Sequence, residues 1–166
     1  MKKVLFLCLI CLLTMSACQQ STPEYVDLGL PSGTLWKFQN ERSMYYTYDE
    51  AINEFGDKLP TREQYAELLT YCTWEWTEDE RGCIVKGKNG NTVYFPAAGF
   101  RETDGDIMFI NRSGRYWSST SNTESVWHLR FENLGLNSYW QESISKYDRS
   151  LWGQNGLSVR LVKINQ

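Results

Sequence analysis

The sequence predicts an α+β domain in which two short helices precede a series of short strands. Two capping boxes mark the helices, because Thr47 and Thr61 are each followed three residues later by a Glu or a Gln. From Thr73 onward the apolar residues tend to recur with a period of two, which is typical of strands. Asn89-Gly90 separates two such runs, as expected for the tight turn of a β-hairpin.

Periodicity and turn residues place the individual elements. The first helix is expected to end at Gly56, a common C-terminal stop. The second helix has an apolar stripe with the spacing i, i+3, i+4 and i+7, formed by Tyr65, Leu68, Leu69 and Cys72. Strands are expected at 25–30, 34–36, 73–77, 83–86, 92–95, 115–118, 125–132 and 157–164. Core packing is the expected role of four tryptophans in these elements, Trp36, Trp74, Trp117 and Trp127.

Residues 1–17 have the three parts of a secretory signal peptide. Lys2 and Lys3 supply positive charge, ten consecutive apolar residues follow at 4–13, and small or neutral residues follow up to Ala17. Ten residues span only about 15 Å as a helix, half of the roughly 30 Å hydrocarbon core of a bilayer. We therefore expect a cleaved signal and not a permanent transmembrane anchor.

The end of this segment, Met15-Ser16-Ala17-Cys18, resembles a bacterial lipobox. The resemblance implies that Cys18 is lipidated, that residues 18–24 form the lipidated cysteine and a short tether, and that residues 25–166 form a single domain. The alternative is an ordinary signal cleaved at about the same place. Because Gln19 is not the aspartate associated with inner-membrane retention, we expect a lipid-anchored cell-envelope protein delivered to the outer membrane. The sequence leaves open which leaflet carries it.

The mature chain is acidic, which bears on its partners. The 17 Lys and Arg residues include Lys2 and Lys3, so the mature chain keeps 15 against 20 Asp and Glu, a net charge of −5. Nucleic-acid binding needs a concentrated basic surface. The expected partners are therefore the membrane, through the lipid, and a glycan or a surface protein, but not a nucleic acid.

The expected signal peptide and lipid anchor divide the cysteines into three groups. Cys8 and Cys11 leave with the signal and Cys18 carries the lipid, so only Cys72 and Cys83 remain in the folded domain. A disulfide is permitted in an exported protein. The sequence leaves two alternatives equally open, a bridge between these cysteines or two buried thiols that act as small apolar side chains.

Seven sequence blocks resemble those of a known family, and they occur in the family's order. They are YVDLGLPSGTLW at 25–36, KLPT at 58–61, CTWEW at 72–76, GKNGN at 87–91, FPAAGFR at 95–101, YWSST at 116–120 and GLSVR at 156–160. On these blocks the chain resembles the Fibrobacter succinogenes major paralogous domain from Tyr25 to near the C-terminus. The family is mostly exported and largely uncharacterised, so the resemblance indicates membership more strongly than activity.

The resemblance implies a C-type-lectin-like fold, in the branch related to formylglycine-generating enzymes. It implies that the first and last strands pair, with 25–30 beside 157–164. It also implies two helices and a second half rich in long loops, which would form the variable face. This chain departs from the family at 37–57, which is compact where the family usually carries a longer glycine-containing insertion.

Catalytic chemistry is almost absent from the sequence, and we expect neither an enzyme nor a cofactor. His128 is the single histidine; we expect it opposite the Trp127/Leu129/Phe131 face, either satisfied or exposed. No G-x-S-x-G elbow accompanies it, and a zinc site would need further His or Cys ligands at short spacings. Formylglycine chemistry needs a later reactive cysteine pair, which this chain lacks. The P-loop-like match at 82–88 has Asn89 where Ser or Thr is required, and is a chance match.

One short acidic segment has two explanations. Asp104-Gly105-Asp106, with Asn111, offers oxygen atoms of the kind that calcium prefers in flexible loops. A plain polar turn explains the same residues, so we do not predict a metal site here.

The most informative remaining feature is an aromatic and polar stretch at 133–155. Flat rings beside amides and charges suit sugar rings, and the same mixture suits protein recognition. The predicted ligand-binding residues are Asn137, Tyr139, Trp140, Tyr147, Asp148 and Arg149. In the alternative, these rings only pin long loops onto the domain.

The sequence therefore predicts a non-catalytic binding or adhesion module. Two further classes stay open: a structural subunit of an envelope or pilus assembly, and an enzyme of the formylglycine-generating type.

Overall fold

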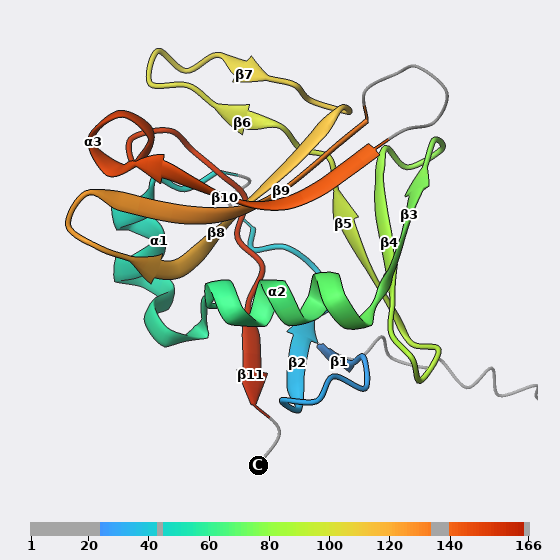
Figure 1. Cartoon of the computed structure of the whole chain (residues 1–166). Helices are drawn as coiled ribbons and strands as arrows, with labels where there is room; N and C mark the ends of the chain where they lie inside the picture. The colour runs from blue at the N-terminus through green and yellow to red at the C-terminus, as the bar shows by residue number, and fades with distance from the viewer. Residues whose placement is uncertain (1–23, 43–44, 134–139, 165–166) are drawn as a thin grey trace, which may run out of the picture.

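The computed structural model describes residues 24–42, 45–133 and 140–164, and it has a mixed α+β architecture with mostly antiparallel strands (Figure 1). The elements in chain order are β1 (Tyr25–Asp27), β2 (Thr34–Lys37), α1 (Tyr48–Phe55), a 3-10 turn (Gly56–Lys58), α2 (Arg62–Tyr71), β3 (Thr73–Thr77), β4 (Gly82–Lys86), β5 (Thr92–Pro96), β6 (Phe100–Arg101), β7 (Ile107–Met108), β8 (Ser113–Ser121), β9 (Ser125–Asn133), β10 (Trp140–Asp148), α3 (Arg149–Trp152) and β11 (Val162–Ile164). The predicted α+β class is confirmed.

Both predicted capping boxes are present. The Thr47 side chain accepts from the Glu50 main chain, the Glu50 side chain accepts from the Thr47 main chain, and Thr61 and Gln64 do the same for α2. The first helix ends at Gly56, which has a φ of 53°. Glycine adopts that conformation without a Cβ clash, so the predicted stop is confirmed.

The strands form four small sheets, ordered β1-β2-β11, β3-β4-β5, β6-β7 and β10-β9-β8. The expected pairing of the first strand with the last is wrong, because β1 and β11 lie on opposite edges of β2. Between β1 and β2 the chain makes a tight turn, in which the Gly33 amide donates to the Leu30 carbonyl. This turn brings β2, the next strand in the chain, beside β1. The expected last strand is also shorter than predicted, since only Val162–Ile164 pairs in a sheet. Leu157 and Ser158 instead make single bridges to Tyr46 and Tyr116.

The second half is more regular than expected. Residues 140–148, predicted as loop, form a nine-residue strand that pairs along all of β9. A third helix, α3, follows directly. The mostly polar composition of this segment gave no strand pattern, because its ladder depends on hydrogen bonds to β9 and not on local propensity.

The β8–β10 sheet separates two apolar cores. On one face, Tyr116, Leu129 and Phe131 pack with α2 and the β3–β5 sheet. On the other face, Trp117 and Val126 pack with α1 and with residues 157–161. Trp36 and Trp117 are fully buried, as predicted. Trp74 and Trp127 are half-buried.

Different strands and helices lie at the two ends of the domain. The first and last described strands, β1 and β11, lie at one end, and the β6–β7 hairpin and α3 lie toward the other (Figure 1). Within the described ranges, no helix has the length and apolar character needed to cross a membrane.

Candidate functional site

An exposed apolar run marks the end of the domain that is remote from β1. Ile107 and Met108 form β7, and Phe109 and Ile110 follow it; their exposed fractions are 47%, 36%, 38% and 51%. We call these four residues the distal patch. Single exposed apolar residues are ordinary, but a contiguous group usually marks an interaction surface.

The backbone holds this patch in a strained turn. Phe109 has a φ of 56°, a left-handed conformation that is rare for a bulky residue. Its carbonyl accepts hydrogen bonds from the amides of Arg112 and Ser113. Beneath it, a Cβ on Gly99 would lie 2.0 Å from the Met108 carbonyl oxygen, so only glycine allows this approach. In proteins, backbone strain that the surrounding structure maintains is found most often at functional sites.

A series of neighbouring aromatic rings runs from the patch into the domain. Ring centroids are 6.0 Å apart for Phe109 and Phe100, and 5.5 Å apart for Phe100 and Trp152. They are 4.4 Å apart for Trp152 and Tyr147, and 4.6 Å apart for Tyr147 and His128. These rings come from β6, the β7–β8 turn, α3, β10 and β9, so only the tertiary fold brings them together.

A buried arginine lies under these rings. The Arg115 guanidinium is 4.1 Å from the centroid of Phe100 and 5.4 Å from that of Trp152, and the residue is only 4% exposed. Its Nε and Nη1 atoms are buried without a hydrogen-bond partner. Burial is the main cause that lowers the pKa of Arg115; Tyr147 and Glu132 act to raise this pKa and the positive charge of Arg130 acts to lower it. We call the set of Phe100, Phe109, Arg115, His128, Tyr147 and Trp152 the distal cluster.

His128 is neither exposed nor satisfied, contrary to expectation. It is fully buried, and both ring nitrogens lack a hydrogen-bond partner. Burial, with smaller contributions from the cations Arg115 and Arg130, holds the pKa of His128 well below its ordinary value. The imidazole is therefore neutral at pH 7, and no hydrogen bond connects it to a nucleophile or an acid.

The predicted ligand-binding residues divide into two groups. Tyr147 belongs to the distal cluster, and Asp148 and Arg149 lie beside it at the start of α3. The Asp148 carboxylate accepts from Ser150 at 2.8 Å and caps that helix. Arg149 pairs with Asp49 at 2.6 Å and lies over the ring of Tyr48. Asn137, Tyr139 and the side chain of Trp140 lie outside the described residues.

The sequence prediction missed Phe100, Phe109 and Arg115. One signal was available, since four consecutive apolar residues at 107–110 directly follow a polar turn. Such a run on the surface is unusual and predicts a contact.

The acidic segment before this run forms a plain turn. The Asp104 carboxylate accepts from the Asp106 amide at 3.1 Å, and Gly105 has a φ of 99°. Across the described parts of the chain, no group of three or more His, Cys, Asp or Glu side chains is placed to hold a metal ion.

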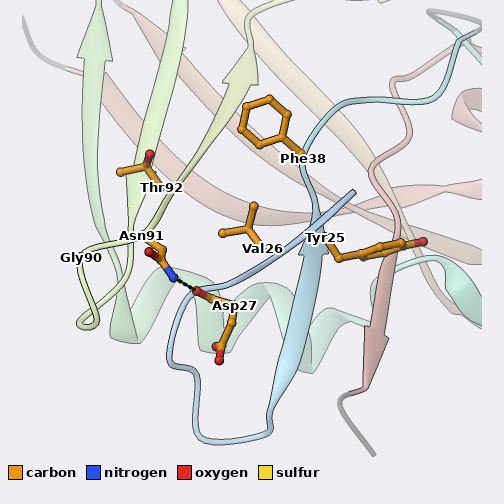
Figure 2. Close-up of a pocket in the computed structure, with 7 residues that line it drawn as sticks. All are labelled: Tyr25, Val26, Asp27, Phe38, Gly90, Asn91 and Thr92. Atoms are coloured by element: carbon orange, nitrogen blue, oxygen red, sulfur yellow. Dashed lines mark hydrogen bonds between the residues drawn. The ribbon is translucent and has the colours of Figure 1, made fainter. Parts of the chain in front are cut away.

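A hollow lies at the end of the domain opposite the distal patch, between β1 and the β4–β5 turn (Figure 2). Its volume is about 460 Å³, and Val26, Phe38 and Thr92 are among the residues that line it. Asn91 donates to the Asp27 carbonyl at 2.8 Å, whereas the Tyr25 ring is directed toward β11, where Lys163 covers it. Because its polar groups are engaged with one another, this hollow is the weaker candidate.

The two cysteines of the domain are not bridged; Cys83 is buried, as the second alternative expected of both, whereas Cys72 is half-exposed. Cys72 precedes Thr73, which pairs with Lys86, whereas Cys83 pairs with Trp76. The two cysteines therefore lie toward opposite ends of this strand pair, more than about 10 Å apart along it. A disulfide needs Cα atoms within about 7 Å.

We expect Cys72 to react slowly with alkylating reagents although it is half-exposed. Burial, assisted by the nearby charge of Glu67, raises the pKa of Cys72 to about 11, so little thiolate exists at pH 7.5. Iodoacetamide labelling followed by mass spectrometry measures this rate. Denatured protein is the control and should label much faster. Rapid labelling of native Cys72 at pH 7.5 would contradict the expectation and favour redox chemistry.

Together, the fold and this site define an α+β domain with an exposed apolar surface over a buried aromatic cluster that contains cationic and unpaired polar groups. No family model, curated protein or solved structure matches this chain.

Proposed function

We propose that this protein is a cell-envelope lipoprotein whose domain is a non-catalytic binding or adhesion module for a glycan or protein ligand. The distal patch is the observation that carries this proposal. If Cys18 carries a lipid in the outer membrane, the tether at 18–24 reaches the domain at Tyr25. The patch lies toward the other end, so it faces away from the anchoring membrane (Figure 1).

The proposed family is the Fibrobacter succinogenes major paralogous domain, and the proposed fold is C-type-lectin-like. The seven matching blocks support this assignment. Trp36, Tyr116, Trp117 and Arg160, which come from three of them, are each at most 1% exposed. The burial of these four residues supports a role of their blocks in the fold more than in an activity.

Two features support a non-catalytic role over the formylglycine-generating alternative. That chemistry requires a reactive thiol pair, whereas the Cys72 thiol has a raised pKa and lies far from Cys83 along the strand pair. His128 makes no hydrogen bond through which it could activate a nucleophile.

The aliphatic character of the patch favours a second candidate, a structural subunit of an envelope or pilus assembly. Ile107, Met108 and Ile110 suit the apolar centre of a protein interface better than they suit a sugar. A stable complex recovered from envelope extracts would distinguish this role from capture of a diffusible ligand.

We expect the double variant I107S/I110S to reduce ligand capture at least tenfold while leaving the melting temperature nearly unchanged, because both side chains are about half exposed. The mature protein in detergent is screened on glycan arrays, with calcium and then with chelator, and against envelope proteins. I164S is the matched control, since Ile164 is 53% exposed but lies in β11. Unchanged capture by I107S/I110S, or an equal loss with I164S, would refute the proposal.

A further inference from the structure

We infer that Arg115 of the distal cluster binds a carboxylate, supplied by an acidic side chain in a protein ligand whose apolar neighbours contact the distal patch. This inference rests on the proposed function and adds the chemical class of the ligand. It uses groups that the fold itself leaves without partners.

The register of the sheet places the relevant groups on one face. Ser113 lies opposite Glu132, Arg115 opposite Arg130, and Trp117 opposite His128. Residues directly opposite in an antiparallel pair share a face and lie about 5 Å apart. The polar groups of β8 and β9 on this face therefore form one connected patch beneath the rings of the distal cluster.

The charges on this face do not balance. Arg130 forms an ion pair with Glu132, whereas Arg115 forms no ion pair with a described residue, and Glu132 attracts it only from a greater distance. Arg115 also lies opposite Arg130, and like charges in that position repel. A buried charge without an opposite charge or hydrogen bonds is costly, so proteins rarely retain one without a reason.

The unused hydrogen-bond donors match a carboxylate. Nε and Nη1 of Arg115 are buried and lack partners. A carboxylate oxygen can accept from either group, and each of them forms a bidentate fork together with Nη2. The Ser113 hydroxyl, two residues earlier on the same face, is also buried without a partner. One carboxylate would compensate the charge of Arg115 and accept from one of these two donors.

Phe109 is the most exposed member of the distal cluster. Its ring is 38% exposed and lies 5.8 Å from the guanidinium of Arg115, whereas Tyr147 and Trp152 are only partly exposed. Arg112, which is exposed, lies 5.9 Å from the same ring. The inference requires the Phe109 ring to move from its strained turn so that a ligand reaches Arg115.

The distal patch favours a protein over a glycan as the source of the carboxylate. Ile107, Met108 and Ile110, which are next to Phe109 in the chain, expose aliphatic surface of the kind that apolar side chains cover and sugar hydroxyls do not. An Asp or Glu flanked by apolar residues therefore matches both parts of the site.

The test uses the mature protein in detergent and two labelled peptides blocked at both ends. One has a glutamate flanked by leucines, and the other has glutamine in its place. Fluorescence anisotropy should show the glutamate peptide binding at least about 30-fold more tightly, the smallest factor expected for a desolvated charge pair. R115M should abolish this preference, whereas R112M, which removes a cation from the same ring, should retain it.

The stability of R115M separates binding from a structural role. Methionine fills much of the same volume and removes an unpaired buried charge, so the melting temperature should stay the same or rise. A lower melting temperature with an unchanged peptide preference would overturn the inference and assign Arg115 to cation–π packing alone.

Three further results would overturn the inference. They are equal binding of the two peptides, binding of neither peptide, and binding of glucuronate but not of the glutamate peptide. In each case the proposed function would still stand if I107S/I110S impaired capture and I164S did not. Equal capture by I107S/I110S and I164S would refute the proposed function, whatever the peptides show.

Discussion

Replacing Arg160 with methionine is expected to lower the free energy of unfolding by about 3 kcal/mol or more, the largest effect we predict for one side chain. Arg160 is 1% exposed. Its guanidinium donates to the carbonyls of Lys37, Phe38 and Tyr94 at 2.8, 2.6 and 2.7 Å, and to the Asn40 side chain at 2.8 Å. It therefore joins β5 to the segment after β2. Methionine would leave these four acceptors without their donor.

Chemical denaturation of R160M and two comparison variants measures this effect. K163M is the matched control, since Lys163 lies 4.4 Å from the Tyr25 ring, much as Arg160 lies 4.6 Å from the Phe95 ring, but Lys163 is exposed. K163M should cost less than about 1 kcal/mol. R160K should fall between the two because lysine keeps the charge but cannot reach all four acceptors. A cost for R160M no larger than for K163M would show that the hydrogen bonds contribute little.

The protein is expected to lose stability steadily as the pH falls below about 6.5, the second large effect. Burial, chiefly, keeps the pKa of His128 well below its ordinary value of 6.5, with Arg115 and Arg130 adding to the shift. The unfolded chain therefore takes up a proton near pH 6.5 while the native protein stays neutral. Protons then favour the unfolded state, and the free energy of unfolding should fall by about 1.4 kcal/mol per pH unit.

The single histidine makes this prediction specific to one residue. Asp and Glu in unfolded chains titrate near pH 4, so His128 dominates the slope between about pH 6.5 and 5. H128F should flatten the slope in that interval, since phenylalanine can keep the stacking on Tyr147, which is parallel to within 4°. Urea unfolding at several pH values measures both proteins. The same slope in H128F and in the wild type would contradict the prediction.

Local features of the fold were predicted well from the sequence. The capping boxes at Thr47 and Thr61 and the stop at Gly56 are present. The hairpin around Asn89-Gly90 is present too, but its loop spans residues 87–91, and of these two residues only Gly90 has a positive φ. Each depends on hydrogen bonds or backbone angles within a few residues, which neighbours in the chain decide. The helix stripe was also placed correctly, with Tyr65 and Leu68 fully buried.

Long-range features were predicted less well. β11 pairs with the edge of β2 that β1 leaves free. Which edge is free depends on the rest of the fold, and no pattern among neighbouring residues encodes it. The strand at 140–148 has few of the apolar residues that mark strands, and it exists because β9 offers a full ladder. The sequence pattern placed His128 on the correct face, but the expectation that it is satisfied or exposed is wrong, because the residue is buried and lacks a hydrogen-bond partner.

The sequence by itself determined the α+β class, the positions of α1 and α2, and the expectation of an exported, lipid-anchored chain with little catalytic chemistry. Only the tertiary structure decided that Phe100, Phe109, Arg115, His128 and Trp152 meet Tyr147 in one cluster. The physical reason is that helix caps and turns form within a few residues, whereas burial and the absence of a hydrogen-bond partner depend on segments far apart in the chain. The inferred ligand class depends on Arg115, whose buried Nε and Nη1 atoms lack hydrogen-bond partners. This absence of partners depends on segments far apart in the chain.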